Sequence, residues 1–323
     1  MKISIAMATY NGARYLQAQL DSFISQTRQP DELIITDDCS IDETEAIVNE
    51  FAKTSPFTVE FYRNKKNLGY CGNFNAALMK TTGNLVFLCD QDDVWFPEKI
   101  EHMVDIAESN PRALVVMNDA ALTDGELNEV GLTKIGQIRN AGLPLDRFVM
   151  GCCCAIRREL LDFCLPIPEG FRAHDSWLVK IADGLDAKLV DEKVLQYYRR
   201  HESNESQFIA NRTTRVSRTS AFLHSSKKIF DPDTPLIEQR DIRQAKIFEA
   251  GIKNIGIDAP YAYQPGLDKL LEVTKNRTAW MERRFEMRRM SMVPRYISVI
   301  RYFIDGGYGT TGGLKAFFRD LAG

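Results

Sequence analysis

The chain has 323 residues, of which 44% are hydrophobic and 26% charged, and its formal net charge is −3. These values are typical of a globular protein and exclude a fibrous or largely disordered chain. The near-neutral balance argues against nucleic acid as a partner, because duplex binding needs a concentrated excess of Lys and Arg.

The first 118 residues alternate between short apolar runs and helix-like segments. Ile3–Ala8 is predicted to be a strand that ends in a turn at Thr9–Gly12, and a helix follows over Tyr15–Ile24. Further strands are predicted at Leu33–Thr36, Phe57–Tyr62, Leu85–Leu88 and Leu114–Met117. Strands that alternate with helices predict an α/β fold with a mostly parallel sheet and helices on both faces.

Polar and acidic residues follow three of these strands directly. They are Tyr10, Asp37-Asp38 and Asp90-Gln91-Asp92-Asp93. Ligands of such sheets bind beyond the carboxyl ends of the strands, so these side chains are expected to converge. Crowded carboxylates repel one another unless a cation lies among them, and Asp oxygens suit Mg²⁺ or Mn²⁺ bound to a substrate diphosphate. The alternative for the acidic run is a solvated or helix-capping loop.

Five segments in the first 200 or so residues carry a resemblance to a known family. They are ATYNGARYL (Ala8 to Leu16), DDCSIDET (Asp37 to Thr44), NLGYCGNFNAAL (Asn67 to Leu78), CDQDDVWFPEKI (Cys89 to Ile100) and HDSWL (His174 to Leu178). Together they resemble the inverting family 2 glycosyltransferases, which have the GT-A fold. The resemblance implies a Rossmann-like catalytic domain at 1–225, with a nucleotide-sugar-binding half at 1–118 and an acceptor-side half with a closing segment at 119–225. Residues 226–323 would form a helical C-terminal extension.

The resemblance implies a donor site built from the strand ends. Asp38 would read the base of a uridine or thymidine nucleotide, since a carboxylate accepts from the ring imide N–H, or it would only cap the next helix. Tyr10 would stack near the base or pack in the core. Asp90 would lie near the ribose, and Asp92 would ligate Mn²⁺ or Mg²⁺. Ala8, Asn73 and Gln91 complete the donor-binding positions, and Asp93 would support the metal or cap the helix that begins near Pro97.

Inverting transfer also needs a base beside the acceptor hydroxyl, and Asp175 is the candidate. Its alternative role is that of a helix-start carboxylate stabilised by the helix dipole. Upstream, Gly151 is expected to allow close backbone approach. Seven cysteines, three of them at 152–154, follow no zinc-site spacing and are expected to be reduced and mostly buried.

The segment LQYYRRHESN is predicted to be a strand that ends in a basic cluster. Arg200 would bind the donor diphosphate and His201 would supply another metal ligand. An ordinary basic strand end at the surface is the alternative for His201. The polar residues from 202 to 220 are expected to act as a lid that orders on donor binding.

Helices are predicted in the last third at Ile237–Ile252 and Leu267–Met290, and after Pro294 the apolar residues gather on one helix side. This amphipathic segment would lie on an anionic membrane surface, or it would pack on the catalytic domain or on a second copy of the chain in a homo-oligomer. No run approaches the roughly 18 apolar residues of a spanning helix, and Ile3–Ala8 is too short for a signal-peptide core. We therefore expect a cytoplasmic protein, located at the inner face of the plasma membrane if the helices bind lipid.

The resulting hypothesis is a metal-dependent, inverting glycosyltransferase of cell-surface polysaccharide synthesis. Asn73-Phe74 and the HDSWL element resemble bacterial rhamnosyltransferase-like members most, which favours dTDP-rhamnose as donor, followed by UDP-hexoses. The acceptor would be a saccharide or a lipid-linked glycan. A non-catalytic sugar-nucleotide-binding or scaffold protein is the alternative, against which Asp175 argues. A nucleotidyltransferase would need a glycine-rich phosphate loop that Thr9–Gly12 does not supply.

Overall fold

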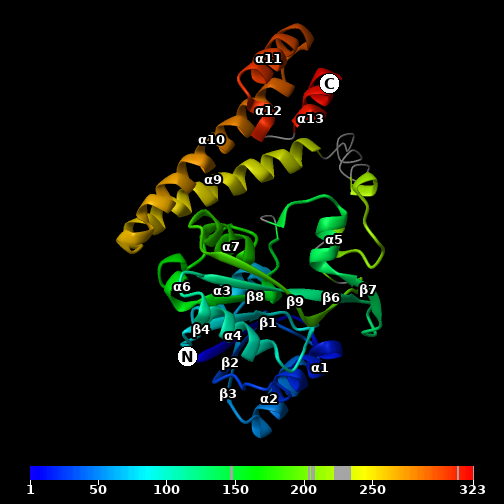
Figure 1. Cartoon of the computed structure of the whole chain (residues 1–323), viewed down its shortest axis with the longest axis vertical. Coiled ribbons are helices and arrows are strands. Elements are labelled where there is room, and N and C mark those ends of the chain that lie inside the picture. The colour runs from blue at the N-terminus through cyan, green and yellow to red at the C-terminus, as the bar shows by residue number, and fades with distance from the viewer. Residues whose placement is uncertain (146–147, 203, 205–207, 222–233, 311–312, 323) are drawn as a thin grey trace. The chain divides into compact units, whose positions relative to one another are not determined.

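The computed structural model describes residues 1–145, 148–202, 204, 208–221, 234–310 and 313–322 (Figure 1). The chain divides into two units, one formed by Met1–Ile167 with Arg172–Ala221 and the other by Pro168–Phe171 with Phe222–Gly323. The domain boundary predicted between residues 225 and 226 falls in the segment 222–233, which lies outside the described residues.

The first unit is built on one sheet with the strand order β3-β2-β1-β4-β8-β6-β9-β5, and β7 pairs with β6. The strands are β1 Ile3–Thr9, β2 Glu32–Asp37, β3 Thr58–Arg63, β4 Leu85–Cys89, β5 Val94–Trp95, β6 Val115–Thr123, β7 Glu129–Thr133, β8 Cys154–Arg157 and β9 Lys188–Arg199. β1 to β4 are mutually parallel, β8 is antiparallel to β4 and β6, and β9 is parallel to β6. The predicted mostly parallel sheet is confirmed, with short antiparallel strands added to it.

Helices flank this sheet (Figure 1). They are α1 Ala13–Ile24, α2 Thr44–Thr54, α3 Gly69–Leu78, α4 Lys99–Ser109, α5 Lys134–Asn140, α6 Arg158–Cys164 and α7 His174–Gly184. Alternate residues of β1, among them Ile5 and Met7, join one buried cluster with Leu20 of α1 and Val104 of α4. This is the period-two burial expected of a strand, and it anchors α1 and α4 to the sheet.

The strand order reverses at β1, because β2 and β3 continue to one side of it while β4 pairs on the other. The parallel register aligns Thr9 with Asp37 and Met7 with Cys89. The loops that begin at Tyr10, Asp38 and Asp90 therefore leave the same edge of the sheet. Such a switch point is where open α/β sheets bind ligands.

The second unit is helical, as predicted for the C-terminal region. It contains α9 Thr234–Asp258, α10 Gln264–Arg288, α11 Met292–Ile304, α12 Gly307–Thr310 and α13 Gly313–Ala322. A small core that includes Tyr302 of α11 and Tyr308 of α12 joins the last helices. Arg284 of α10 binds the buried Asp320 of α13, with Nε 2.6 Å from Oδ2. In the described parts of the chain, no helix is at once long enough and apolar enough to cross a membrane.

Candidate active site

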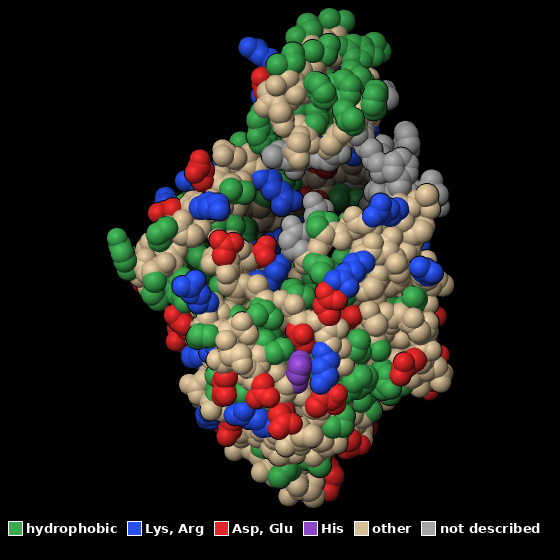
Figure 2. All heavy atoms as spheres, viewed as in Figure 1, with side chains coloured by type: hydrophobic (Ala, Val, Ile, Leu, Met, Phe, Trp, Pro, Cys, Tyr) green, Lys and Arg blue, Asp and Glu red, His purple; other side chains and the backbone are tan. Residues whose placement is uncertain are grey.

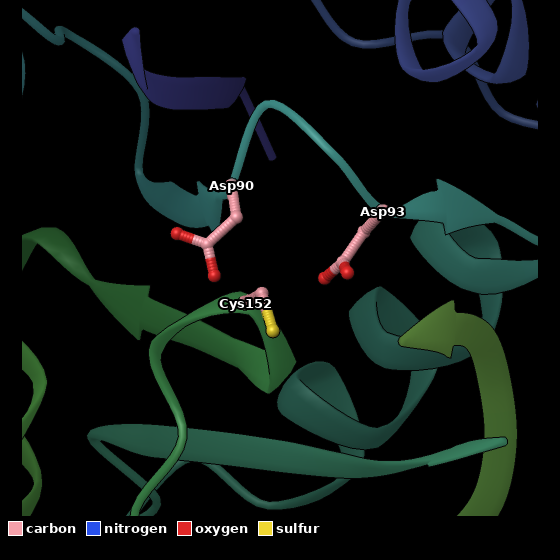
Figure 3. Close-up of side chains that lie close together, drawn as sticks. All are labelled: Asp90, Asp93 and Cys152. Atoms are coloured by element: carbon pink, nitrogen blue, oxygen red, sulfur yellow. The ribbon is translucent and has the colours of Figure 1, made fainter. Parts of the chain in front are cut away.

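The acidic loop after β4 lies against the turn at Gly151–Cys153. Asp90, Asp93 and Cys152 each place one ligand atom within 4.8 Å of the others, with the two carboxylates on either side of the thiol (Figure 3). Burial, and next the charges of Asp92 and Asp175, raise the pKa of Asp90 to about 7. The pKa values of Asp93 and Cys152 are also raised, above all by burial. The loop therefore crowds carboxyl groups whose ionisation a bound cation would favour.

Asp93 organises this loop from inside the protein. Its carboxylate is fully buried and accepts from Nε2 of Gln196 at 2.9 Å and from the backbone N–H of Arg199 at 3.3 Å. A capping role at α4 is excluded, because that helix begins at Lys99 and no side chain caps it. A protonated, soft thiol is a poor ligand for Mg²⁺ or Mn²⁺, and both oxygens of Asp93 already accept hydrogen bonds within the protein. Cys152 and Asp93 therefore fit such an ion less well than the rest of the loop.

The structure brings the two predicted metal ligands together. Nε2 of His201 lies 2.7 Å from Oδ2 of Asp92, and Nδ2 of Asn204 donates to the same oxygen at 3.0 Å. Only 15% of the Asp92 side chain and 15% of the His201 side chain are exposed. A carboxylate, an imidazole and an amide oxygen are ligand types that Mn²⁺ accepts, so these residues fit a divalent ion. Asn204 was not singled out from the sequence.

Arg199 belongs to the predicted basic strand end, but its contacts were not predicted. From the end of β9, its Nε donates to the backbone oxygen of Asp92 at 2.8 Å and its Nη1 to that of Gly125 at 2.7 Å. Its guanidinium also lies over the ring of Tyr15, 4.5 Å from the centroid. Arg199 thus fixes the acidic loop. Arg200, the predicted diphosphate ligand, follows directly after β9, and its Nη1 lies 3.2 Å from the hydroxyl of Tyr198.

Asp38 is held at the start of α3. Its carboxylate accepts from the backbone N–H groups of Leu68 at 2.7 Å and Gly69 at 2.8 Å, and from Nδ2 of Asn64 at 3.0 Å. Asp38 does not cap the next helix, α2, because the N-cap of that helix is Glu43 and no side chain caps it; Asp38 instead binds the first N–H groups at the start of α3. Because a carboxylate offers about four acceptor positions, Asp38 keeps the capacity for a further donor such as an imide N–H.

Gln91 links the two loops at the switch point. Its Oε1 accepts from the backbone N–H of Tyr10 at 2.9 Å, and its Nε2 donates to the backbone oxygen of Tyr10 at 3.1 Å. A Cβ on Gly12 would lie 2.2 Å from the same Oε1. The Gln91 amide bonds to the backbone of Tyr10 and not to its side chain. Tyr10 is 51% exposed, so its ring is available to a planar ligand.

Asn73, another predicted donor-binding residue, is buried and links two elements of the fold. Nδ2 of Asn73 donates to the backbone oxygen of Thr9 at 3.0 Å, and its Oδ1 accepts from Asn64 at 2.9 Å. Asn73 thus connects α3 to the carboxyl end of β1. Ala8 is half-buried within β1 opposite Thr36.

Asp175 lies in the first turn of α7, where its Oδ1 accepts from the N–H of Ser176 at 2.6 Å. A Cβ on Gly151 would lie 2.8 Å from Nε2 of His174, which confirms the predicted close approach. The buried ring of His174 stacks on Phe74 at 3.9 Å, and burial lowers its pKa to about 4. Asp175 therefore has a neutral imidazole beside it. All seven cysteines are free thiols, as expected.

Part of the predicted lid lies outside the described residues, namely positions 203 and 205–207. The described part docks on α5 through Gln137. Its Nε2 donates to the backbone oxygens of Arg212 and Thr214, and its Oε1 accepts from the N–H of Val216 at 2.9 Å. Backbone groups that have no helix or strand partner are thereby satisfied by one side chain.

Comparison with known proteins decides the family. The family model described as Glycosyl transferase family 2 matches residues 4–164. An uncharacterized glycosyltransferase of Nostoc sp. is 30% identical over 232 residues, which are 66% of this chain and 69% of that protein. The chain belongs to glycosyltransferase family 2. This glycosyltransferase is also 29% identical over 216 residues to the dTDP-rhamnosyl transferase RfbG of Shigella flexneri, covering 62% of this chain and 73% of that protein.

Solved structures similar to the glycosyltransferase support the predicted GT-A fold. S. aureus TarS 1-349 in complex with UDP has a TM-score of 0.54 and 18% identity, over 85% of this chain and 91% of that one. The mannosyltransferase PcManGT from Pyrobaculum calidifontis, in complex with GDP-Man and Mn²⁺, has a TM-score of 0.52 and 15% identity, over 99% and 86% of the two chains. The fold assignment is therefore confirmed.

Proposed function

We propose that this glycosyltransferase is metal-dependent and inverting, with Asp175 as its base. One observation carries the proposal. A Cβ on Gly151 would lie 3.5 Å from the Cβ of Asp175, and the next residue, Cys152, places its thiol within 4.8 Å of an Asp90 oxygen. This nearness of α7 to the donor-side loop supports a base on the acceptor side of a sugar whose diphosphate binds at that loop.

The chemical step follows from these positions. A carboxylate oxygen of Asp175 takes the proton of the acceptor hydroxyl while the hydroxyl oxygen forms a bond to the anomeric carbon. The bond from the anomeric carbon to the diphosphate breaks at the same time, and the nucleoside diphosphate leaves with the bonding electron pair. Attack opposite the leaving group inverts the anomeric centre.

The donor would be bound by the switch-point loops. Tyr10 would stack near the base, Asp38 would accept from the base, and Arg200 would contact the diphosphate. A bound Mn²⁺ or Mg²⁺, held by Asp92 and His201, would neutralise charge on the leaving group. The fit of carboxylate and imidazole at Asp92 supports this ion site.

The first choice of donor is dTDP-rhamnose, and a UDP-hexose is the second. The likeness to a dTDP-rhamnosyl transferase supports the first choice, and the UDP complex of a protein with a similar fold supports the second. The acceptor would be a saccharide or a lipid-linked glycan of the cell surface, used at the inner face of the plasma membrane by a peripherally bound enzyme.

A screen of nucleotide sugars with Mn²⁺ or Mg²⁺ tests the proposal, with donor binding and single-turnover transfer measured for each variant. We expect Asp175→Asn to bind donor as the parent does and to transfer at least about 100-fold more slowly, which is the usual contribution of a general base. Asp92→Ala should weaken donor binding in the presence of metal.

Asp183→Asn is the matched control, because Asp183 lies on the same helix and its side chain is 44% exposed in an ion pair with Lys188. It should transfer at the parent rate. Transfer by Asp175→Asn at the parent rate would remove Asp175 from the mechanism. A parent protein that binds donors but neither hydrolyses nor transfers them would favour the non-catalytic alternative.

A further inference from the structure

The exposed side of α11 is more apolar than the side that packs. Val299 and Tyr302 enter the small core of the second unit. The rest of the apolar residues are exposed: Met292, Val293, Tyr296, Ile297, Ile300, Phe303 and Ile304. We name these seven residues the α11 apolar face. Packing within the protein therefore accounts for the lesser part of the amphipathic pattern.

The α11 apolar face continues onto α13. Phe303 contacts Phe317 of α13 with ring centroids 4.8 Å apart, and Phe317 in turn contacts Phe318, whose side chain is 64% exposed. Figure 2 shows hydrophobic side chains gathered over this part of the molecule. Continuous exposed apolar surface of this kind usually marks a contact with a membrane or another protein.

A basic side chain borders the face. From Arg289 onward the sequence has five Lys and Arg against two Asp. Asp305 lies 2.8 Å from Arg283, and Asp320 is buried against Arg284 and also pairs with Arg319. Arg301 is exposed, and the helical period puts it beside Ile297 and Ile304. Arg301 therefore places a positive charge on the rim of the face.

We propose that the α11 apolar face docks on an anionic lipid surface. A second copy of the chain would bring like charges of the two rims together, whereas anionic headgroups neutralise them. The helix has 13 residues, about 20 Å, and would lie in the plane of the interface with its apolar side chains in the acyl boundary. Tyr296 suits that depth because its ring is apolar and its hydroxyl polar. This docking is independent of the donor and of the base.

Vesicle sedimentation of the full chain tests the proposal. We expect binding to vesicles rich in phosphatidylglycerol, weaker binding to pure phosphatidylcholine vesicles, and loss of binding at high salt. The double variant Ile297→Glu with Ile304→Glu should reduce the partition coefficient at least about tenfold, because two buried aliphatic side chains are replaced by charges. Both positions are exposed, at 65% and 75%, so the fold should be unaffected.

Ile257→Glu is the matched control, since Ile257 is 80% exposed on α9, outside the face. It should bind vesicles as the parent does. Equal binding by the double variant and the parent, or no binding of the parent to phosphatidylglycerol, would overturn the proposal. A different pattern would also overturn it. In this pattern the parent forms a dimer without lipid, as seen by sedimentation, the double variant does not, and vesicles bind neither protein.

Discussion

Nε2 of His201 lies 2.7 Å from Oδ2 of Asp92, although 109 positions separate the two residues in the sequence. The strand β9 makes this contact, because it ends beside the acidic loop and presents Arg199 to the backbone of Asp92. The ring of His201 is also held by Tyr15, with centroids 4.7 Å apart. The two side chains are thus held next to each other by contacts within the protein, and such preorganisation favours binding.

We expect His201→Ala to lower the affinity for Mn²⁺ about 10- to 100-fold, because one ligand or orienting group of Asp92 is lost. The measurement is calorimetric titration of Mn²⁺ into the protein with UDP or dTDP present. The fold should be retained, since the ring lies at the edge of the site and is partly exposed.

A similar pair elsewhere in the protein provides the control. Nε2 of His102 lies 2.7 Å from Oδ2 of Asp191, and these side chains are 30% and 28% exposed. His102→Ala removes the same kind of contact on α4 and should leave Mn²⁺ affinity unchanged. If the two variants lose affinity equally, His201 has no specific role at the metal.

Binding of a divalent ion should release a proton from Asp90. In the metal-free protein, burial and the neighbouring charges raise the pKa of Asp90 to about 7, so the carboxyl is largely protonated below that pH. A cation favours the charged form, so Mn²⁺ affinity should rise by up to about tenfold per pH unit below pH 7 and level off above it. Calorimetry in two buffers with different ionisation enthalpies measures the released proton.

Asp90→Asn serves as the control for this proton. It should bind Mn²⁺ with no proton release and with a flatter pH dependence, whatever its absolute affinity. Unchanged proton release in this variant would assign the proton to another group, such as Asp93, whose pKa is also raised.

The sequence predicted the parallel half of the sheet well, for a local reason. β1, β2 and β4 are continuous apolar runs, each followed by a turn signal, so periodicity locates them within a residue or two. β6 was predicted only over Leu114–Met117 but extends to Thr123. Its centre is polar: Asp119 is buried because its Oδ1 accepts from the N–H of Ile135 in α5. Tertiary contacts of this kind leave no mark in local hydropathy.

Part of the candidate site was predictable, and the contacts that support it were not. The acidic run and the basic strand end were recognised from their places after strands, and the family resemblance gave Asp92 and His201 their proposed metal roles. The contact of Arg199 with the backbone of Asp92 was not predicted. This contact depends on the antiparallel pairing of β5 with β9, which aligns Val94 with Tyr197, and no local pattern encodes that pairing.

Variants of Gln91 can show whether this residue positions the Tyr10 loop or contacts the donor directly. Gln91→Ala removes both hydrogen bonds to the Tyr10 backbone, and Gly12→Ala should displace the same amide, because its Cβ would lie 2.2 Å from Oε1. We expect each single variant to raise the KM for donor severalfold. In the Gln91→Ala background, Gly12→Ala should add almost nothing, which a double-mutant cycle measures as coupling of about 1 kcal/mol.

Additive effects of these two substitutions would contradict the idea that Gln91 acts through the Tyr10 loop, and would favour the direct donor contact predicted from the sequence. Gly256→Ala, in helix α9 of the second unit, is a suitable control for a glycine replaced by alanine. Its Cβ would make an ordinary contact 4.0 Å from Oε1 of Gln264, so it should not couple to Gln91.

The buried ring of His174 should make the protein lose stability in mild acid. Burial lowers its pKa from 6.5 to about 4, so between these pH values the unfolded chain binds the proton and the folded protein does not. The contribution of the neutral ring to the free energy of unfolding is complete above pH 6.5 and is lost as pH falls toward 4, by at most about 3 kcal/mol.

The raised pKa values of Asp90 and Asp93 make stability rise as pH falls, so the parent alone cannot show the effect of His174. The comparison must be with His174→Asn, measured by urea unfolding at pH 7 and pH 4.5. The variant should lose less stability than the parent over this range. Equal losses in His174→Asn and the parent would show that His174 is not held neutral by burial.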